Sequence, residues 1–373
     1  MSQADQQLAP SLTPMQLARE TVSGMGLYDP EVAECAIDLS DNTNLWGMPP
    51  AAARALREAP ASAVSRYPSL YSTPLRDSVL RYVGLDGVPE LGVVTGCGSD
   101  DVIDSAMRTF GVAGDRLAFS SPTFTMVPVF ARLNGIEPVA IPFTEQLDVD
   151  ADRLVEIGAK ITYLCAPNNP TATAVSRAAV EYVVANARGI VLLDEAYAEF
   201  APEVFVDLAA GFDRLLVLRT FSKAFGMAGL RVGYGVGHRA LTGLVERARG
   251  PYKVSSLAEH AAAAALEDSP DGVQWVRAHA ALAVEHRTRF AIALRTLGLA
   301  PLPSAANFVF VPTARAGVIG AVLRRRGIRV RAFSGLSRDL ACLAESGGVA
   351  LRIGIGPWEM MQPVLDTLAE AQS

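Results

Sequence analysis

The chain has 373 residues, of which 50% are hydrophobic and 19% are charged, and its formal net charge is −6 at pH 7. This length predicts about two domains with a large core, and the composition excludes a disordered chain. The negative charge argues against a general nucleic-acid surface, because a phosphate backbone attracts concentrated positive charge. The start of the chain lacks a targeting pattern, and no apolar stretch approaches the roughly 18 residues of a membrane span. We therefore expect a cytoplasmic protein with small-molecule partners.

Residues 1–40 predict an extended arm with a helix, which should pack on a second domain or on a partner subunit. From about residue 91 to 240, short apolar strands alternate with helical stretches, which is typical of a mostly parallel sheet covered on both faces. Seven strands are expected, at 92–95, 116–119, 137–141, 161–165, 190–193, 215–218 and 231–236. Helices are expected at 100–110 after Ser99 as N-cap, and at 125–134, 177–187 and 239–249.

A break at Gly250-Pro251 marks the expected start of a second region. The sequence thus predicts an α/β fold with an arm at 1–40, a large domain at 41–250 and a smaller α+β domain at 251–373. The predicted elements of the smaller domain are helices at 256–267 and 273–296, a strand at 307–311, a helix at 317–326, strands at 328–332 and 349–355, and a helix at 357–371.

Cysteine and histidine spacing does not indicate a metal site. His279 and His286 lie seven residues apart on one predicted helix, but no third ligand is near, so we expect ordinary helix surface. The four cysteines are far apart and form no Cys-x-x-Cys pair, so free thiols are expected at Cys35, Cys97, Cys165 and Cys342.

Lysine is rare in this chain, with three lysines against thirty arginines. Lys223 follows the apolar run 215–218, with Ser222 beside it and Arg231 eight residues later. A lysine amine can lose its proton and form a Schiff base, whereas a guanidinium cannot. We therefore expect Lys223 to bond a carbonyl cofactor that carries a phosphate.

Other polar residues follow the expected strands, and ligands bind at the carboxyl ends of parallel strands. The glycine turn 96–100 opens a helix whose free amides could bind phosphate, although simple turn formation explains it as well. Phe124 could stack on a flat heterocycle or pack in the core. Asn168 and Asn169 offer amide donors, while an Asn-Pro turn explains one of them.

Asp194 ends an apolar strand, and Tyr197 follows three residues later. A buried carboxylate needs a cationic partner, and a protonated pyridine nitrogen would be one. A metal carboxylate and a nucleotide-binding strand end are alternatives, and the absence of a Gly-x-x-x-x-Gly-Lys-Ser/Thr segment disfavours the second. With the lysine and the phosphate-binding residues, this set predicts pyridoxal 5'-phosphate as the cofactor.

On these motifs, the chain resembles the fold-type I, class I/II pyridoxal-phosphate-dependent aminotransferases over essentially its whole length, with histidinol-phosphate aminotransferases the nearest likeness. The resemblance implies that Lys223 forms the Schiff base, Asp194 pairs with the pyridine nitrogen, and Tyr197 contacts the ring hydroxyl. Further cofactor contacts are implied for Gly98, Ser99, Asp100, Ser222 and Arg231 around the phosphate, for Asn169 at the ring hydroxyl, and for Phe124 stacked on the ring where the family usually has tyrosine.

Substrate and subunit contacts follow from the same resemblance. The segment Arg66-Tyr67-Pro68 resembles a motif whose tyrosine reaches the cofactor phosphate of the neighbouring subunit, which implies a homodimer with shared sites. Arg352 matches the arginine that pairs with a substrate carboxylate, and Arg331 matches one that meets a substrate phosphate. A surface ion pair at the end of a strand is the alternative for Arg331. Three further substrate contacts are implied: Tyr28 in the arm, Asn44 in the segment 42–47, and Asn169.

Two departures from the family pattern stand near the predicted site. Ala172 occupies the place of a turn glycine after Asn169-Pro-Thr, and the segment 42–47 has Trp46 and lacks the usual proline. The cofactor assignment does not depend on these positions, whereas the substrate assignment does.

The expected reaction is amino transfer from histidinol phosphate, with 2-oxoglutarate as the amino acceptor. An aromatic amino-acid aminotransferase and a phospho-amino-acid decarboxylase on the same scaffold are the alternatives. A non-catalytic effector-binding protein would be expected to lose Lys223 or to gain a DNA-binding segment, and neither is seen.

Overall fold

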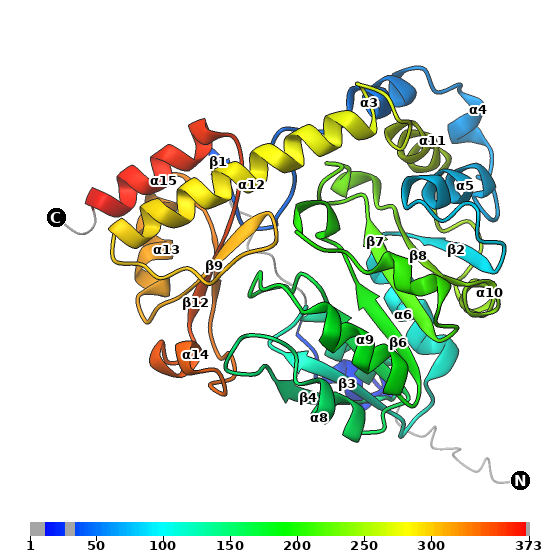
Figure 1. The fold of residues 1–373 in the computed structure, drawn as a ribbon, viewed down its shortest axis with the longest axis horizontal. Helices are drawn as coiled ribbons and strands as arrows, with labels where there is room; N and C mark the ends of the chain where they lie inside the picture. The colour runs from blue at the N-terminus through cyan, green and yellow to red at the C-terminus, as the bar shows by residue number, and fades with distance from the viewer. Residues whose placement is uncertain (1–11, 27–33, 371–373) are drawn as a thin grey trace, which may run out of the picture. The chain divides into compact units, whose positions relative to one another are not determined.

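The computed structural model describes residues 12–26 and 34–370, which belong to two units divided after Glu34 (Figure 1). The first unit contains two single-turn helices, α1 (Pro14–Leu17) and α2 (Glu20–Ser23), with no buried residue. Thr13 begins α1 through a capping box with Gln16.

A seven-stranded sheet forms the centre of the second unit, in the order β2-β8-β7-β6-β5-β3-β4. Strand β8 is antiparallel to both neighbours and all other pairs are parallel, which confirms the expected mostly parallel sheet. The strands are β2 (Leu91–Gly96), β3 (Arg116–Ser121), β4 (Glu137–Pro142), β5 (Ile161–Cys165), β6 (Ile190–Asp194), β7 (Leu215–Thr220) and β8 (Gly233–His238).

The central strands are apolar on both sides because helices cover both faces of the sheet. In β6, Ile190 and Leu192 pack in one core cluster, whereas Val191 and Leu193 pack in the other. This alternation follows from the two-residue period of a strand. Figure 1 shows α6 (Ser99–Phe110) against the sheet, and α7 (Met126–Leu133) and α10 (Arg239–Ala248) lie on the same side of it.

Two predicted boundaries in this sheet region were wrong. Strand β8 begins at Gly233 and not at Arg231, because Arg231 has a left-handed backbone (φ 51°) after the short helix η3 (Ala228–Leu230). The N-cap of α6 is Gly98, with φ 80°, so Ser99 is the first helical residue.

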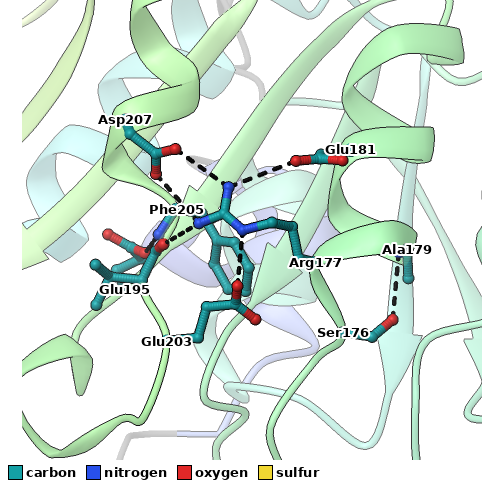
Figure 2. A network of polar contacts seen from close by, with 9 residues as sticks. Ser176, Arg177, Ala179, Glu181, Glu195, Glu203, Phe205 and Asp207 are labelled. Atoms are coloured by element: carbon teal, nitrogen blue, oxygen red, sulfur yellow. Dashed lines mark hydrogen bonds and ion pairs between the residues drawn. The ribbon is translucent and has the colours of Figure 1, made fainter.

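Ser176 is the N-cap of helix α9 (Arg177–Asn186), and its hydroxyl accepts a hydrogen bond from the amide of Ala179 (Figure 2). Arg177 then fixes the segment that follows β6. Its guanidinium contacts Glu203 at 2.7 Å and Asp207 at 3.1 Å, and it reaches Glu181 on its own helix at 3.5 Å (Figure 2). The network ties residues 203–207 to α9. Helix α8 (Ala151–Glu156) lies beside α9.

A second, antiparallel sheet has the order β11-β12-β9, with β11 (Arg331–Phe333), β12 (Ala350–Gly354) and β9 (Phe308–Pro312). The strand expected at 328–332 is two strands: β10 (Ile328–Arg329) pairs with β1 (Ile37–Asp38), and only β11 joins the sheet. The chain changes partner at Val330, so one continuous strand was wrong. Helices α13 (Ala316–Arg325), α12 (Val273–Thr296) and α15 (Trp358–Glu370) pack beside this sheet, and α14 (Ala341–Glu345) precedes β12.

Three helices before the first sheet strand were not predicted: α3 (Pro50–Arg57), α4 (Ser62–Ser65) and α5 (Thr73–Tyr82). Helix α11 (Ser256–Ala265) packs on all three, and its alanines at 258, 261, 262 and 265 are buried. The domain division at residue 250 stays a prediction, and the contacts of α11 are with segments before that residue. None of the helices in the described ranges is long and apolar enough to span a bilayer.

Candidate active site

Polar segments gather at one edge of the seven-stranded sheet. Strands β5, β6 and β7 are parallel, and β2 runs in the same direction as β7 because both are antiparallel to β8. The residues after these four strands therefore lie at a common edge, where the chain also enters β8. This geometry brings the glycine turn, the asparagine pair, Asp194, Lys223 and Arg231 to the same side, as parallel sheets do at their ligand sites.

Lys223 lies in the turn after β7, and its amine donates a hydrogen bond to the carbonyl of Asp41 at 2.9 Å. The ammonium nitrogen is 5.9 Å from the centroid of the Tyr197 ring. Burial, followed by the nearby charge of Arg352, lowers the pKa of Lys223 to about 8. About a tenth of this amine is therefore uncharged at pH 7, and the uncharged amine is the state that bonds a carbonyl.

Asp194 ends β6, and its side chain is only 4% exposed. Tyr163 donates its hydroxyl to Oδ2 at 2.7 Å, and the amide of Ala196 donates to Oδ1 at 3.0 Å. Burial raises the pKa of Asp194 to about 6. Within the described ranges, no cationic side chain forms an ion pair with this carboxylate. A cationic ring nitrogen would supply the missing positive partner.

Tyr197 and Asn42 form a buried pair beside Asp194. The Asn42 amide donates to the Tyr197 hydroxyl at 3.1 Å, and burial raises the pKa of that phenol. The side-chain oxygen Oδ1 of Asn42 is itself buried and has no hydrogen-bond partner in the part of the chain that the structure describes. The phenol and the amide are thus placed to contact an oxygen substituent of a flat ring.

An anion site lies where the glycine turn meets the loop before β8. The Arg231 guanidinium donates to the Ser222 hydroxyl and to the Asp100 carboxylate, each at 3.4 Å. A Cβ at Gly98 would lie 2.5 Å from Nη2 of Arg231, so only glycine allows this approach. The first amides of α6, from Ser99 onward, have no partner within the helix. The structure therefore brings the five expected phosphate residues together.

Arg352 lies in the middle of β12, and its guanidinium donates to Oδ1 of Asn169 at 2.7 Å and to the carbonyl of Ser40 at 2.5 Å. The ring centroids of Phe308 and Phe333 are 5.5 and 5.7 Å from its Cζ atom. These contacts hold the guanidinium plane beside Asn169, at the same sheet edge as the lysine.

Arg331 is the register partner of Arg352 across β11 and β12. Its Cζ atom lies 6.0 Å from the centroid of the Phe333 ring. No carboxylate in the described ranges forms an ion pair with Arg331, so the surface ion pair that was its alternative is not found there. Two guanidinium groups on neighbouring strands thus face the space around Phe333.

The two neighbouring asparagines have different surroundings. Asn168 is buried and donates to the carbonyl of Pro122 at 3.0 Å and to the Thr171 hydroxyl at 2.7 Å, which joins two loops. Asn169 instead contacts Arg352. Phe124 is half-buried and packs against the core cluster that includes α6, in agreement with the core alternative for this residue.

Asn44 holds the lysine loop. Its amide donates to the carbonyl of Ala224 at 2.7 Å, and its own carbonyl accepts from the amide of Trp46 at 2.9 Å. Gly226 approaches the same segment so closely that a Cβ there would lie 1.9 Å from the carbonyl oxygen of Gly47. The contacts observed for Asn44 are structural, and its predicted substrate contact stays a prediction.

Tyr67 is 82% exposed and stacks on Tyr252 with ring centroids 4.7 Å apart. Its predicted contact with a second subunit is not represented in a single chain and stays a prediction. Tyr28 lies outside the described residues. Ala172 keeps the left-handed backbone of the glycine that it replaces, with φ 64°, and its amide donates to the carbonyl of Asn168.

His279 and His286 are not ordinary helix surface, and that expectation was wrong. Their rings lie 6.3 and 5.6 Å from the ring of Trp46, and Trp275 stacks on His279. Nδ1 of His286 lies 2.9 Å from the carbonyl oxygen of Gly356. The tryptophan that departs from the family pattern therefore packs on α12.

Two residues of the site were missed from the sequence, Asn42 and Tyr163. Asn42 opens the segment 42–47, but its contact with Tyr197 spans 155 positions. Tyr163 could have been noticed as a phenol within a buried strand, and the β5–β6 register places Cys165, two residues later, opposite Asp194.

Comparisons with known proteins agree with this geometry. The family model for aminotransferase class I and II matches residues 35–367. Histidinol-phosphate aminotransferase from Roseiflexus castenholzii is 39% identical over 351 residues, which cover 90% of each chain, and the one from Methylibium petroleiphilum is 36% identical over 354 residues, covering 92% of each.

Solved structures extend the likeness to the fold. A putative histidinol-phosphate aminotransferase from Erwinia carotovora atroseptica has a TM-score of 0.80 at 26% identity, covering 91% of this chain and 98% of its own. The Sinorhizobium meliloti histidinol-phosphate aminotransferase in complex with pyridoxal-5'-phosphate has a TM-score of 0.81 at 24% identity, over 98% of both chains, which supports the fold. The predicted aminotransferase fold and activity are confirmed, and the chain belongs to the class I and II aminotransferase family.

Proposed function

We propose that this enzyme binds pyridoxal 5'-phosphate at the sheet edge and transfers the amino group of histidinol phosphate to 2-oxoglutarate. The observation that carries the substrate proposal is the pair of opposed arginines, Arg331 and Arg352, on neighbouring strands. The names of the curated relatives support the same donor.

The residues at the sheet edge fit the cofactor. When bound, pyridoxal phosphate supplies an aldehyde that an amine can bond and a pyridine ring that withdraws electrons from the substrate. Asp194, which lacks a cationic partner in the described ranges, would hold the ring nitrogen protonated. Arg231, Ser222 and the first amides of α6 would bind the phosphate.

Lys223 would move the proton in the reaction. Its pKa of about 8 leaves part of the amine uncharged, so the amine can take a proton from the Cα atom of the substrate and donate that proton to another atom in a later step. Tyr197 and Asn42, which are joined by a hydrogen bond, would contact the oxygen substituent of the ring. Asn44 and Gly226 fix the loop from which the amine acts.

Both proposed substrates carry about two negative charges. A phosphate monoester has a charge close to −2 near pH 7, and 2-oxoglutarate has two carboxylates. Two arginines match either anion, and a guanidinium binds a carboxylate or a phosphate through paired hydrogen bonds. We assign Arg352, oriented by Asn169, mainly to a carboxylate of the acceptor, and Arg331 to the phosphate of the donor.

The active unit proposed is a cytoplasmic homodimer in which Tyr67 reaches the partner's cofactor phosphate. The support is a group of exposed large side chains: Val64 is 75% exposed, Tyr71 is 51% exposed and Tyr252, which stacks on Tyr67, is 43% exposed. Val64, Tyr67 and Tyr71 are close in the chain and Tyr252 stacks on Tyr67, and exposed apolar side chains gathered in this way mark an interaction surface more often than free surface.

The test is a single-turnover experiment without the acceptor. Histidinol phosphate, phenylalanine and phosphothreonine are each mixed with the cofactor-loaded enzyme, and the absorbance change of the bound cofactor is followed. The fastest change is expected with histidinol phosphate, and no carbon dioxide is expected to be released from phosphothreonine. Preference for phenylalanine would replace the proposal with an aromatic aminotransferase, and carbon dioxide release from phosphothreonine would replace it with a decarboxylase.

A further inference from the structure

A second cavity lies between one face of helix α12 and the segments around Phe200 and Ser304. Its volume is about 550 Å³. Small-molecule sites commonly have volumes of about 300 to 1,000 Å³. The lining contains neither Lys223 nor Arg352, so this cavity is separate from the candidate active site.

The cavity holds an arginine whose charge is not matched. Arg287 is half-buried, and its Nη1 donates to the carbonyls of Ala306 at 2.7 Å and Phe200 at 3.5 Å. Across residues 12–26 and 34–370, no carboxylate forms an ion pair with it. Burial lowers the pKa of this guanidinium, and no acidic neighbour opposes that effect. A guanidinium has five N–H donors, so the remaining donors can bind an anion.

The one carboxylate in the lining does not neutralise Arg287. Glu199 accepts a hydrogen bond from the Tyr82 hydroxyl at 3.0 Å, and burial raises its pKa, which disfavours its charge. Arg277 adds a second positive group, since its side chain is 66% exposed and its nearest carboxylate, on Asp268, is 4.0 Å away. The balance of charge in the cavity therefore favours an anion.

The two arginines also indicate the shape of the ligand. They lie ten residues apart on α12, which corresponds to about 15 Å along a helix. Between them the lining is apolar, with Ala281 and Val284 on the helix and Phe200 opposite. A ligand that fills this space needs an apolar body as well as an anionic group.

We propose that this cavity is a second ligand site, which binds a small organic anion by pairing its carboxylate or phosphate with Arg287. The walls also carry residues of the active site. Phe200 ends the short helix η1 (Ala198–Phe200), which begins directly after Tyr197. Ala306 precedes Asn307, whose side-chain amide donates to the backbone carbonyl of Asn42 at 3.0 Å. An anion on Arg287 would therefore bind next to two segments that hold the Tyr197–Asn42 pair.

The experiment is a fluorine NMR titration of the full-length, cofactor-loaded protein with 4-fluorobenzoate and, separately, 4-fluorophenyl phosphate. The first probe tests a carboxylate and the second a phosphate. Because either probe could also bind Arg331 and Arg352 of the active site, the titration is repeated on the double variant Arg331→Gln/Arg352→Gln. At least one probe should bind that variant with a Kd below about 1 mM.

Two cavity variants are then made in the Arg331→Gln/Arg352→Gln background. Arg287→Gln removes the charge, and Ala281→Phe fills the cavity while leaving Arg287 and its hydrogen bonds in place. Both should weaken probe binding by about tenfold or more. If Arg287→Gln does not fold, as judged by its melting temperature, Ala281→Phe alone decides. The proposal is overturned if neither probe binds the Arg331→Gln/Arg352→Gln protein, or if the affinity is unchanged in a folded cavity variant.

Discussion

Replacing Asp194 with asparagine should make the cofactor-free protein more stable at alkaline pH than the wild type. The pKa of Asp194 is raised from 3.8 to about 6 because its carboxylate is buried. Each pKa unit corresponds to about 1.36 kcal/mol, so ionisation of Asp194 costs the folded state about 3 kcal/mol. The native state binds its proton more tightly than the unfolded state does. The proton on Asp194 therefore stabilises the folded state fully below about pH 4, and this stabilisation is lost as the pH rises through about 6.

The assay is urea unfolding of both cofactor-free proteins at pH 5 and pH 8. The difference in unfolding free energy, variant minus wild type, should rise by about 1.5 kcal/mol between these values, since roughly half of the ionisation cost develops there. The change with pH is the relevant quantity, because an amide also alters the hydrogen bonds from Tyr163 and Ala196. The exposed Asp86→Asn is the matched control. A difference that is the same at both pH values would refute the burial argument.

Three further predictions concern the site. Tyr163→Phe removes a hydrogen bond to the Asp194 carboxylate, worth about 1.5 to 3 kcal/mol, and should lower kcat roughly tenfold or more. The control Tyr82→Phe also loses a hydrogen bond to a carboxylate and should not lower kcat in this way. Equal effects of the two variants would contradict the role of Tyr163. Arg331→Gln should lower kcat/KM for histidinol phosphate by about 2 to 5 kcal/mol in transition-state terms and spare phenylalanine by comparison, and equal loss for both donors would remove the phosphate assignment. Hybrid dimers of Lys223→Ala and Tyr67→Phe should be more active than either parent, because one site then carries both lesions and the other carries none; no gain in verified hybrids would count against the shared site.

The elements with a clear pattern could be predicted closely from the sequence. Strand β5 has its predicted bounds, and β6 extends the prediction by one residue, because every residue in both strands is buried and apolar runs of this length are typical of central strands. Helix α12 also has its predicted bounds. Strand β8 was misplaced because nothing local in the sequence indicates the left-handed backbone of Arg231.

The residues that carry the chemistry of the site were easier to predict than the residues that hold them in place. Lys223 and Asp194 follow apolar strands, and their side chains have few alternative uses there. The contacts that hold them depend on segments far apart in the chain: Asn42 reaches Tyr197, and Asn44 reaches Ala224 across 180 positions. Such contacts depend on tertiary packing, which no local pattern encodes. For the same reason, the packing of Trp46 on α12 was not predicted.

The most direct test of the central claim is to locate the bond between the protein and its cofactor. The purified enzyme is reduced with borohydride, digested, and its peptides are identified by mass. The chain has three lysines, Lys160, Lys223 and Lys253, so each outcome identifies one residue. We expect a pyridoxyl group on the peptide that contains Ser222 and Lys223. A pyridoxyl group on Lys160 or Lys253, or none at all on cofactor-saturated protein, would contradict it.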